Sequence, residues 1–87
     1  MLEDVKQALR ITNNAYNKEI EDLIDAAKLE LEISGVKRIE EADPLIKRAV
    51  KLYCKANFGF DNPDAEGFQR SYEMLKQHLS LSGDYNA

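Results

Sequence analysis

Few residues in this chain have the types and spacing that catalysis or metal binding requires. His78 is its one histidine and Cys54 its one cysteine, and neither has a second histidine or cysteine at ligand spacing. Glycine-rich phosphate loops, nucleophile elbows and zinc signatures are absent from the sequence. Acids three residues apart, such as Asp22 and Asp25, are common on exposed helices and here accompany no catalytic pattern. We therefore expect no enzyme, and no catalytic, cofactor-binding or metal-binding residues.

Four cations in the middle of the chain form the clearest chemical pattern. At about 100° per residue, Lys47, Arg48, Lys51 and Lys55 fall on one side of a helix. They could bind nucleic acid phosphates, but salt sensitivity would reflect only about four contacts. The cluster has no interleaved aromatic residues and no polar base-reading side chains. An acidic protein surface is therefore the favoured partner of these cations.

The helix that positions these cations is predicted for residues 43–59. Asp43 suits the N-cap, Pro44 suits the first helical position, and Gly59 suits the C-terminal end. The side opposite the cations is apolar, which predicts a place in the core. The predicted core residues of this helix are Ile46, Ala49, Val50 and Tyr53.

A second helix, predicted for residues 16–34, has apolar residues on two sides. Its core stripe consists of Ile20, Leu23, Ile24, Ala27 and Leu31. Roughly opposite lies a strip of Ala26, Leu29 and Ile33, bordered by Asp22. A helix with two apolar sides usually has two partners. The strip is covered either by another helix of the same subunit or by another subunit, and both alternatives stay open.

Two further helices complete an expected all-α bundle of about four helices. They are predicted for residues 2–11 and 64–81, with core residues Leu9, Phe68, Tyr72, Leu75 and Leu79. Residues 82–87 are predicted to be a mobile tail. The helical periodicity and the length of 87 residues predict a single domain over residues 1–87.

Charge is unevenly distributed along the chain. The net charge is −4, made up of −4 for residues 1–33, +3 for residues 34–60 and −3 for residues 61–87. Such a chain can pair with copies of itself head to tail. No apolar run approaches the roughly 20 residues of a membrane span, so we expect no membrane association and a cytosolic protein at synthesis.

The order of these elements resembles the tailed-phage head–tail connector proteins, also called head-completion or DNA-packaging adaptor proteins. The opening pattern consists of Val5, Lys6, Leu9, Arg10 and Ile11, then a short polar break, then the core stripe of residues 20–31 with Lys28. The third helix, from Ile46 through Tyr53 to Phe58 and Phe60, is similar to the alanine-centred helix of that family, which ends in aromatic residues. The matching positions are core positions.

The resemblance implies a structural subunit that assembles as a ring of about a dozen copies, a dodecamer, beneath the portal protein. Such a ring extends the DNA channel and docks a tail-completion or stopper protein, while DNA passes through without sequence-specific binding. The implied location is the virion head–tail interface, with the host cytoplasm before assembly. The family has no catalytic residues, and its larger members have a longer connector than residues 36–42 here.

A ring requires two different complementary surfaces on each subunit. We expect one surface on the second predicted helix, with Asp22, Asp25, Ala26, Leu29 and Ile33, and the other at the four cations of the third. The alternative function is a small helical DNA-binding or regulatory protein of prophage origin. It requires a helix-turn-helix with a basic recognition helix, which the acidic charge and the long connector after Gly35 disfavour. A generic helical interaction module also remains open.

Overall fold

Four α-helices make up the computed structural model, which describes residues 1–59 and 61–87. In chain order they are α1 (Leu2–Leu9), α2 (Asn17–Ile33), α3 (Pro44–Asn57) and α4 (Ala65–Leu81). These described residues contain no strand, and the predicted all-α bundle of four helices is confirmed. Phe60, one of the aromatic residues in the family resemblance, lies outside the described residues.

The ends of the helices follow from local backbone geometry. Asp43 caps α3, since its carboxylate accepts hydrogen bonds from the N–H groups of Leu45 at 2.8 Å and Ile46 at 3.4 Å. The first helix is shorter than the predicted 2–11, because Arg10 adopts a left-handed conformation with φ 61° and closes the last turn. The third is shorter than the predicted 43–59, because Phe58 is extended.

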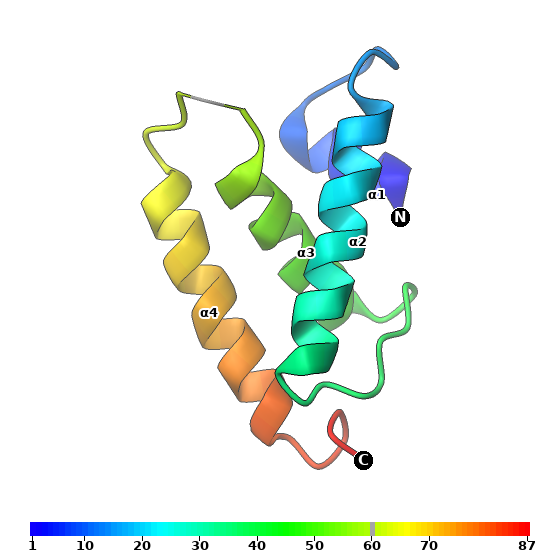
Figure 1. Cartoon of the computed structure of the whole chain (residues 1–87), viewed down its shortest axis with the longest axis vertical. Helices are drawn as coiled ribbons and strands as arrows, with labels where there is room; N and C mark the ends of the chain where they lie inside the picture. Colours follow the sequence, from blue (N-terminus) through cyan, green and yellow to red (C-terminus); the bar gives the residue numbers. More distant parts are fainter. Residues whose placement is uncertain (60) are drawn as a thin grey trace.

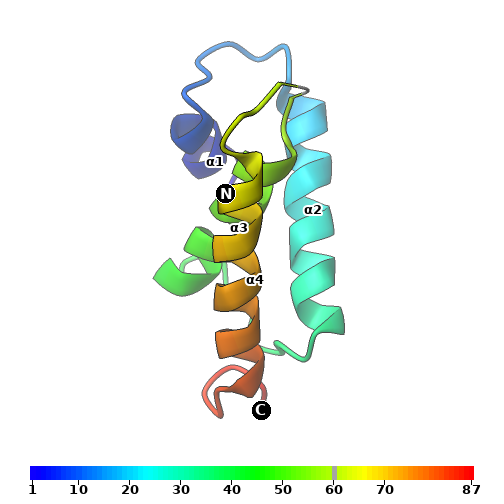
Figure 2. The ribbon, with the colours of Figure 1, turned by 90° about the vertical axis from the view of Figure 1, so that its left-hand side faces the viewer.

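α3 is the central helix of the fold. It packs against each of the other three helices, most extensively against α4, and α1 also contacts α2. Figure 1 shows α3 between α2 and α4, and Figure 2 shows α1 and α2 on different sides of it. Every other helix is therefore positioned by its contact with α3.

The core lies along the sides of the helices that face α3. The predicted core residues that are buried are Ile20, Ile24, Ala27, Leu31, Ile46, Ala49, Val50, Tyr72 and Leu79. The other predicted core residues are partly buried against them, namely Leu9, Leu23, Tyr53, Phe68 and Leu75. Among the described residues, four buried hydrophobic residues were outside the predicted set, namely Val5, Val36, Leu52 and Cys54, and the charged Lys6 is buried as well. Val36 belongs to the connector after α2, so that connector also contributes to the core.

Residues 82–87 contact the connector that precedes α3. The Tyr85 hydroxyl donates to the Asp43 carboxylate at 2.9 Å, and the Tyr85 carbonyl accepts from the N–H groups of Lys37 and Arg38. The same bond raises the pKa of the Tyr85 hydroxyl, because ionisation would place two negative charges together. The mobility predicted for residues 82–87 stays a prediction, but these bonds give the segment a partner within the chain.

Two core side chains have ionisable groups that burial keeps neutral. Burial raises the pKa of the Cys54 thiol to about 12. Burial also raises the pKa of the Tyr72 hydroxyl, and the nearby negative charge of Glu30 adds to the effect. Both groups are favoured in their protonated form in the native state, so alkaline conditions oppose folding.

Matched leucine substitutions on the two sides of α2 test the packing. Leu31→Ala should lower the free energy of unfolding by about 2–5 kcal/mol, because Leu31 is fully buried. Leu29→Ala should change it by no more than about 0.5 kcal/mol, because Leu29 is exposed. Urea unfolding followed by circular dichroism measures both values. Equal losses for the two variants would contradict the assigned orientation of α2.

The pKa of Cys54 predicts a loss of stability at high pH. The ordinary pKa of a cysteine thiol, about 9.0, applies in the unfolded chain, whereas burial raises the pKa of the native thiol to about 12. The contribution of the buried thiol to the free energy of unfolding is therefore complete below pH 9. It is lost as the pH rises towards 12, by up to about 1.4 kcal/mol per pH unit. Urea unfolding between pH 8 and 10 should show a steeper decline for the natural chain than for Cys54→Ala. Parallel declines would contradict this role of the thiol.

Candidate assembly surfaces

The exposed side of α2 carries both acidic and apolar residues, and we call it the α2 outer surface. It consists of Asp22, Asp25, Ala26, Leu29 and Ile33, all of them exposed. Leu29 is 57% exposed and Ile33 is 77% exposed. The first alternative for this apolar strip, a covering helix of the same subunit, is therefore wrong. The 3.6-residue period explains the exposure, because the core stripe occupies the opposite side of α2.

The acids of this surface are only partly neutralised within the chain. The Asp22 carboxylate forms an ion pair with Lys18, which lies one turn earlier on α2, and Lys18 Nζ is 3.1 Å from Asp22 Oδ1. Both side chains are well exposed, so this pair contributes little. Among the described residues, Asp25 has no ion-pair partner within 4.0 Å. Negative charge is therefore available to a partner.

The four predicted cations all lie on α3 and form what we call the α3 basic surface. Lys47 and Lys55 already have contacts inside the subunit. Lys47 Nζ lies 3.8 Å from Asp4 Oδ1 of α1, and Lys55 Nζ lies 5.2 Å from the centre of the Phe68 ring of α4. Arg48 and Lys51 form no ion pair with any residue that the structure describes. These two are the cations most available to another molecule.

Two adjoining hollows run along this surface. The first, of about 150 Å³, is lined by Pro44, Arg48, Lys51, Leu52 and Lys55. The second, of about 340 Å³, is lined by Ala8, Leu9, Arg10, Lys55, Phe58, Asp61, Asn62 and Phe68. Lys55 lines both hollows, and we call the two together the groove along α3. Arg10 was missing from the predicted surface. The first helix was predicted to continue to residue 11, so the sequence did not indicate that the chain turns at Arg10.

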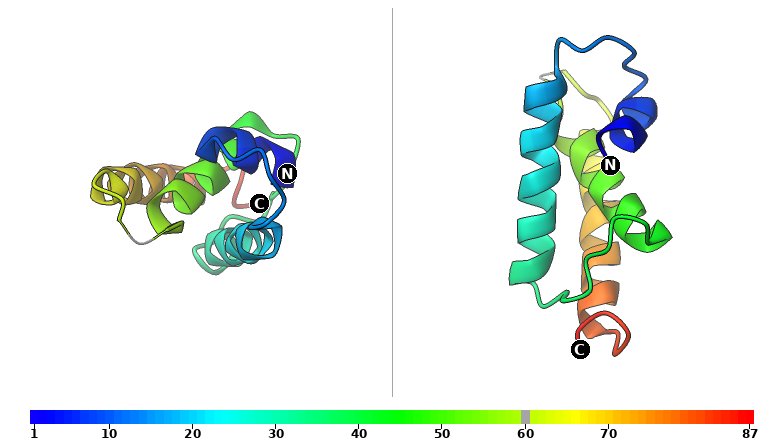
Figure 3. Two further views of the ribbon diagram at one scale, coloured as in Figure 1. Left: turned by 90° about the horizontal axis from the view of Figure 1, so that it is seen from above. Right: turned by 90° about the vertical axis from the view of Figure 1, so that its right-hand side faces the viewer.

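The α2 outer surface and the α3 basic surface lie on opposite sides of the subunit. Ile24 on α2 and Ile46 on α3 belong to the same buried core between the packed helices. At about 100° per residue, Leu29 lies roughly opposite Ile24, and Lys55 roughly opposite Ile46. The view from above in Figure 3 shows α2 and α3 side by side, so their outer sides face away from each other.

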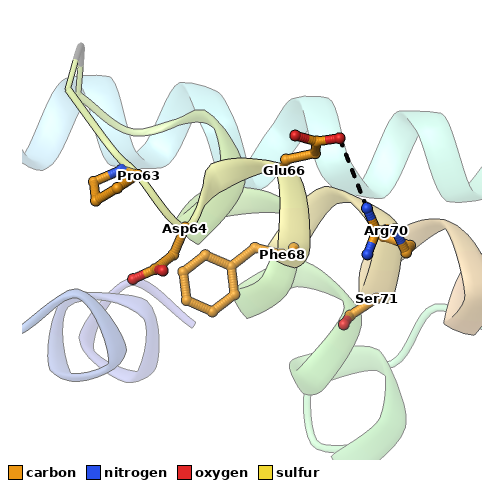
Figure 4. A pocket seen from close by; sticks show the side chains of 7 residues that line it. Pro63, Asp64, Glu66, Phe68, Arg70 and Ser71 are labelled. Atoms are coloured by element: carbon orange, nitrogen blue, oxygen red, sulfur yellow. Dashed lines mark ion pairs between the residues drawn. The ribbon is translucent and has the colours of Figure 1, made fainter.

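A further hollow lies elsewhere, at the beginning of α4. It has a volume of about 530 Å³ and is lined by Pro63, Asp64, Glu66, Gly67, Phe68, Arg70 and Ser71. Figure 4 shows Arg70 turned towards Glu66, with a nitrogen-to-oxygen distance of 3.7 Å. Neither a histidine nor a cysteine lines this hollow. Within residues 1–59 and 61–87 no group of three or more histidine, cysteine or acidic side chains is arranged to hold a metal ion.

Comparison with known families identifies the family of this chain. The model of a family described as phage connector protein matches residues 1–86. This chain belongs to the phage connector protein family. The match confirms the family resemblance found in the sequence. The family consists of structural phage proteins and is not a known enzyme family. Searches of curated proteins and of solved structures return no match to the chain.

Membership gives this connector a structural role in the virion, in contact with other phage structural proteins. In the part of the chain that the structure describes, no helix has the length and apolar character needed to cross a membrane.

Charge substitutions on the connector subunit should separate surface residues from residues that hold the helices together. Arg48→Glu and Lys51→Glu should each change the free energy of unfolding by no more than about 0.5 kcal/mol, because neither cation forms an ion pair with a residue that the structure describes. Lys76→Ala should lower it by about 1 kcal/mol, because Lys76 pairs with Glu30 of α2 at 3.1 Å. Urea unfolding at moderate salt measures these changes. A larger loss for Arg48→Glu than for Lys76→Ala would contradict the assignment.

Proposed function

We propose that this connector is the subunit of a ring at the head–tail interface of a phage or prophage virion. Each subunit meets the next head to tail, and the α2 outer surface of one contacts the α3 basic surface of the other. The ring sits beneath the portal protein, extends the DNA channel and receives a tail-completion or stopper protein. Before assembly the subunit is in the host cytoplasm.

The observation that carries this proposal is the presence of two unlike, complementary surfaces on opposite sides of one subunit. A head-to-tail contact is heterologous, and it closes into a ring when the rotation between neighbours permits. The α2 outer surface supplies apolar side chains with nearby carboxylates, and the α3 basic surface supplies unpaired cations. Two identical surfaces on one side would favour a dimer instead.

The size of the apolar contact suggests that one interface is weak by itself. Full burial of Leu29 and Ile33 would contribute about 1.5–3 kcal/mol for each side chain. Association costs an estimated 4–15 kcal/mol in translational and rotational freedom. Charge pairing across the contact mainly adds specificity and a faster encounter. Assembly should therefore depend on protein concentration, or on a portal that holds several subunits together.

The proposed ring passes DNA without binding its sequence. The subunit has a net charge of −4, which opposes retention of phosphates. The alternative, a DNA-binding or regulatory protein, is favoured by one observation, the groove that contains Arg48, Lys51, Lys55 and Arg10. A duplex-binding assay at moderate salt tests it, and tight, sequence-selective retention would contradict the ring proposal.

Paired aspartate substitutions test the proposed interface. Leu29→Asp with Ile33→Asp should leave a folded subunit that no longer assembles, because two carboxylates would replace the apolar part of the contact. Sedimentation velocity over a range of concentrations, with and without portal protein, measures assembly, and circular dichroism measures folding.

A matched control is available on α4, where Met74 is 67% and Leu81 is 75% exposed. Met74→Asp with Leu81→Asp adds the same charge to the subunit outside the proposed interface and should leave assembly unchanged. Assembly by the α2 double variant at natural concentrations would contradict the proposed role of its outer surface. Loss of helical signal in that variant would place Leu29 and Ile33 in the core instead.

A further inference from the structure

The α2 outer surface has different chemistry at its two ends. Asp22 and Asp25 lie in the first half of the helix, whereas Leu29 and Ile33 lie in the second. The last turn of α2 contains no basic residue, although Glu30 and Glu32 are there. The partial negative charge of this helix end is therefore not offset by a cation of its own turn.

The side chains that line the groove along α3 also differ between the beginning and the end of the helix. Arg48 and Lys51 line its first part, near the beginning of the helix. Its second part, near the end of α3, is lined by the apolar side chains of Leu9, Phe58 and Phe68, together with Arg10, Lys55, Asp61 and Asn62. Two cations that have no ion pair among the described residues thus lie at one end, and the large apolar side chains lie at the other.

The two surfaces also have similar lengths. At about 1.5 Å per residue, Asp22 to Ile33 on α2 spans roughly 16 Å, and Arg48 to Asn57 at the end of α3 spans roughly 14 Å. An α2 helix laid along the groove can therefore place its acids and its apolar residues on matching partners at the same time.

We propose that α2 of one subunit lies parallel to α3 of its neighbour. In this register Asp22 faces Arg48, and Leu29 and Ile33 enter the hollow bounded by Leu9, Phe58 and Phe68. Arg10 then lies near the end of the neighbour's α2 and supplies the cation which that helix end lacks. This register rests on the proposed ring and specifies how its subunits meet.

The opposite, antiparallel register has one advantage and a larger cost. It would bring helix ends of opposite partial charge together, an effect that is weak and screened by salt at a surface. It would also move Leu29 and Ile33 away from Leu9, Phe58 and Phe68 and place them against Arg48 and Lys51. That change loses the apolar burial and desolvates two cations against aliphatic side chains, so the parallel register is favoured.

Disulfide cross-linking distinguishes the two registers. Asp22→Cys with Arg48→Cys, and Ile33→Cys with Ala8→Cys, should give covalent ladders of several subunits under mild oxidation of the assembled protein. Asp22 and Arg48 lie on opposite sides of one subunit, too far apart for a bond within it. The natural Cys54 is buried and its high pKa keeps it unreactive, so it need not be removed.

The crossed pairs are the matched controls. Asp22→Cys with Ala8→Cys, and Ile33→Cys with Arg48→Cys, should give no ladder. Ladders from the crossed pairs, or assembly without a ladder from either set, would overturn the register and leave the ring proposal intact. Failure of the natural chain to assemble at any concentration, with or without portal protein, would instead contradict the ring itself and the register with it.

A charge exchange gives a second, independent test of the same contact. Asp22→Arg alone and Arg48→Asp alone should each weaken assembly by about tenfold or more, because each places like charges together. The two changes in one chain should restore assembly, because the pair is reversed across each interface. If the double variant instead lost assembly by the sum of the two single effects, the proposed contact between Asp22 and Arg48 would be overturned.

Discussion

The fold depends on the burial of one side of α3. Ile46, Ala49 and Val50 are fully buried there, and the other three helices all pack on α3. A helix of 14 residues cannot be stable in water by itself, so α3 forms because this side is covered. The cap from Asp43 fixes its beginning. With that side in the core, the period of the helix leaves Arg48, Lys51 and Lys55 together on the outside.

The small number of helices explains why one side of α2 is uncovered. In a small domain each helix can pack on few neighbours, and α2 packs on α1 and α3, which lie on its core side. An ion pair between Lys76 and Glu30 links α2 to α4. No helix therefore lies over Leu29 and Ile33. A domain with these apolar residues exposed gains from association, whereas a solvated surface would gain nothing.

Periodicity predicted what repeats along a helix, and it could not predict contacts between distant residues. The stripe through Ile20 and Leu31 follows from spacing alone, and both residues are buried. Val36 follows no helical period, because it lies in a connector, yet it is fully buried. The contacts of Lys47 with Asp4 and of Lys55 with Phe68 depend on how α1 and α4 dock. Those contacts distinguish Lys47 and Lys55 from the other two cations of the cluster, a difference that the sequence does not indicate.

This division of the cations bears on how a ring can be assembled reversibly. Of the four cations, Lys47 pairs with an acid and Lys55 lies over an aromatic ring, whereas Arg48 and Lys51 have neither kind of contact with the residues that the structure describes. Two cations and two exposed aliphatic side chains make a modest interface, which favours free subunits when they are dilute. Once several subunits are held on one platform, each new contact forms at a high effective concentration, and the last subunit gains two contacts at once. Weak single contacts therefore suit a connector that must assemble at one place and time.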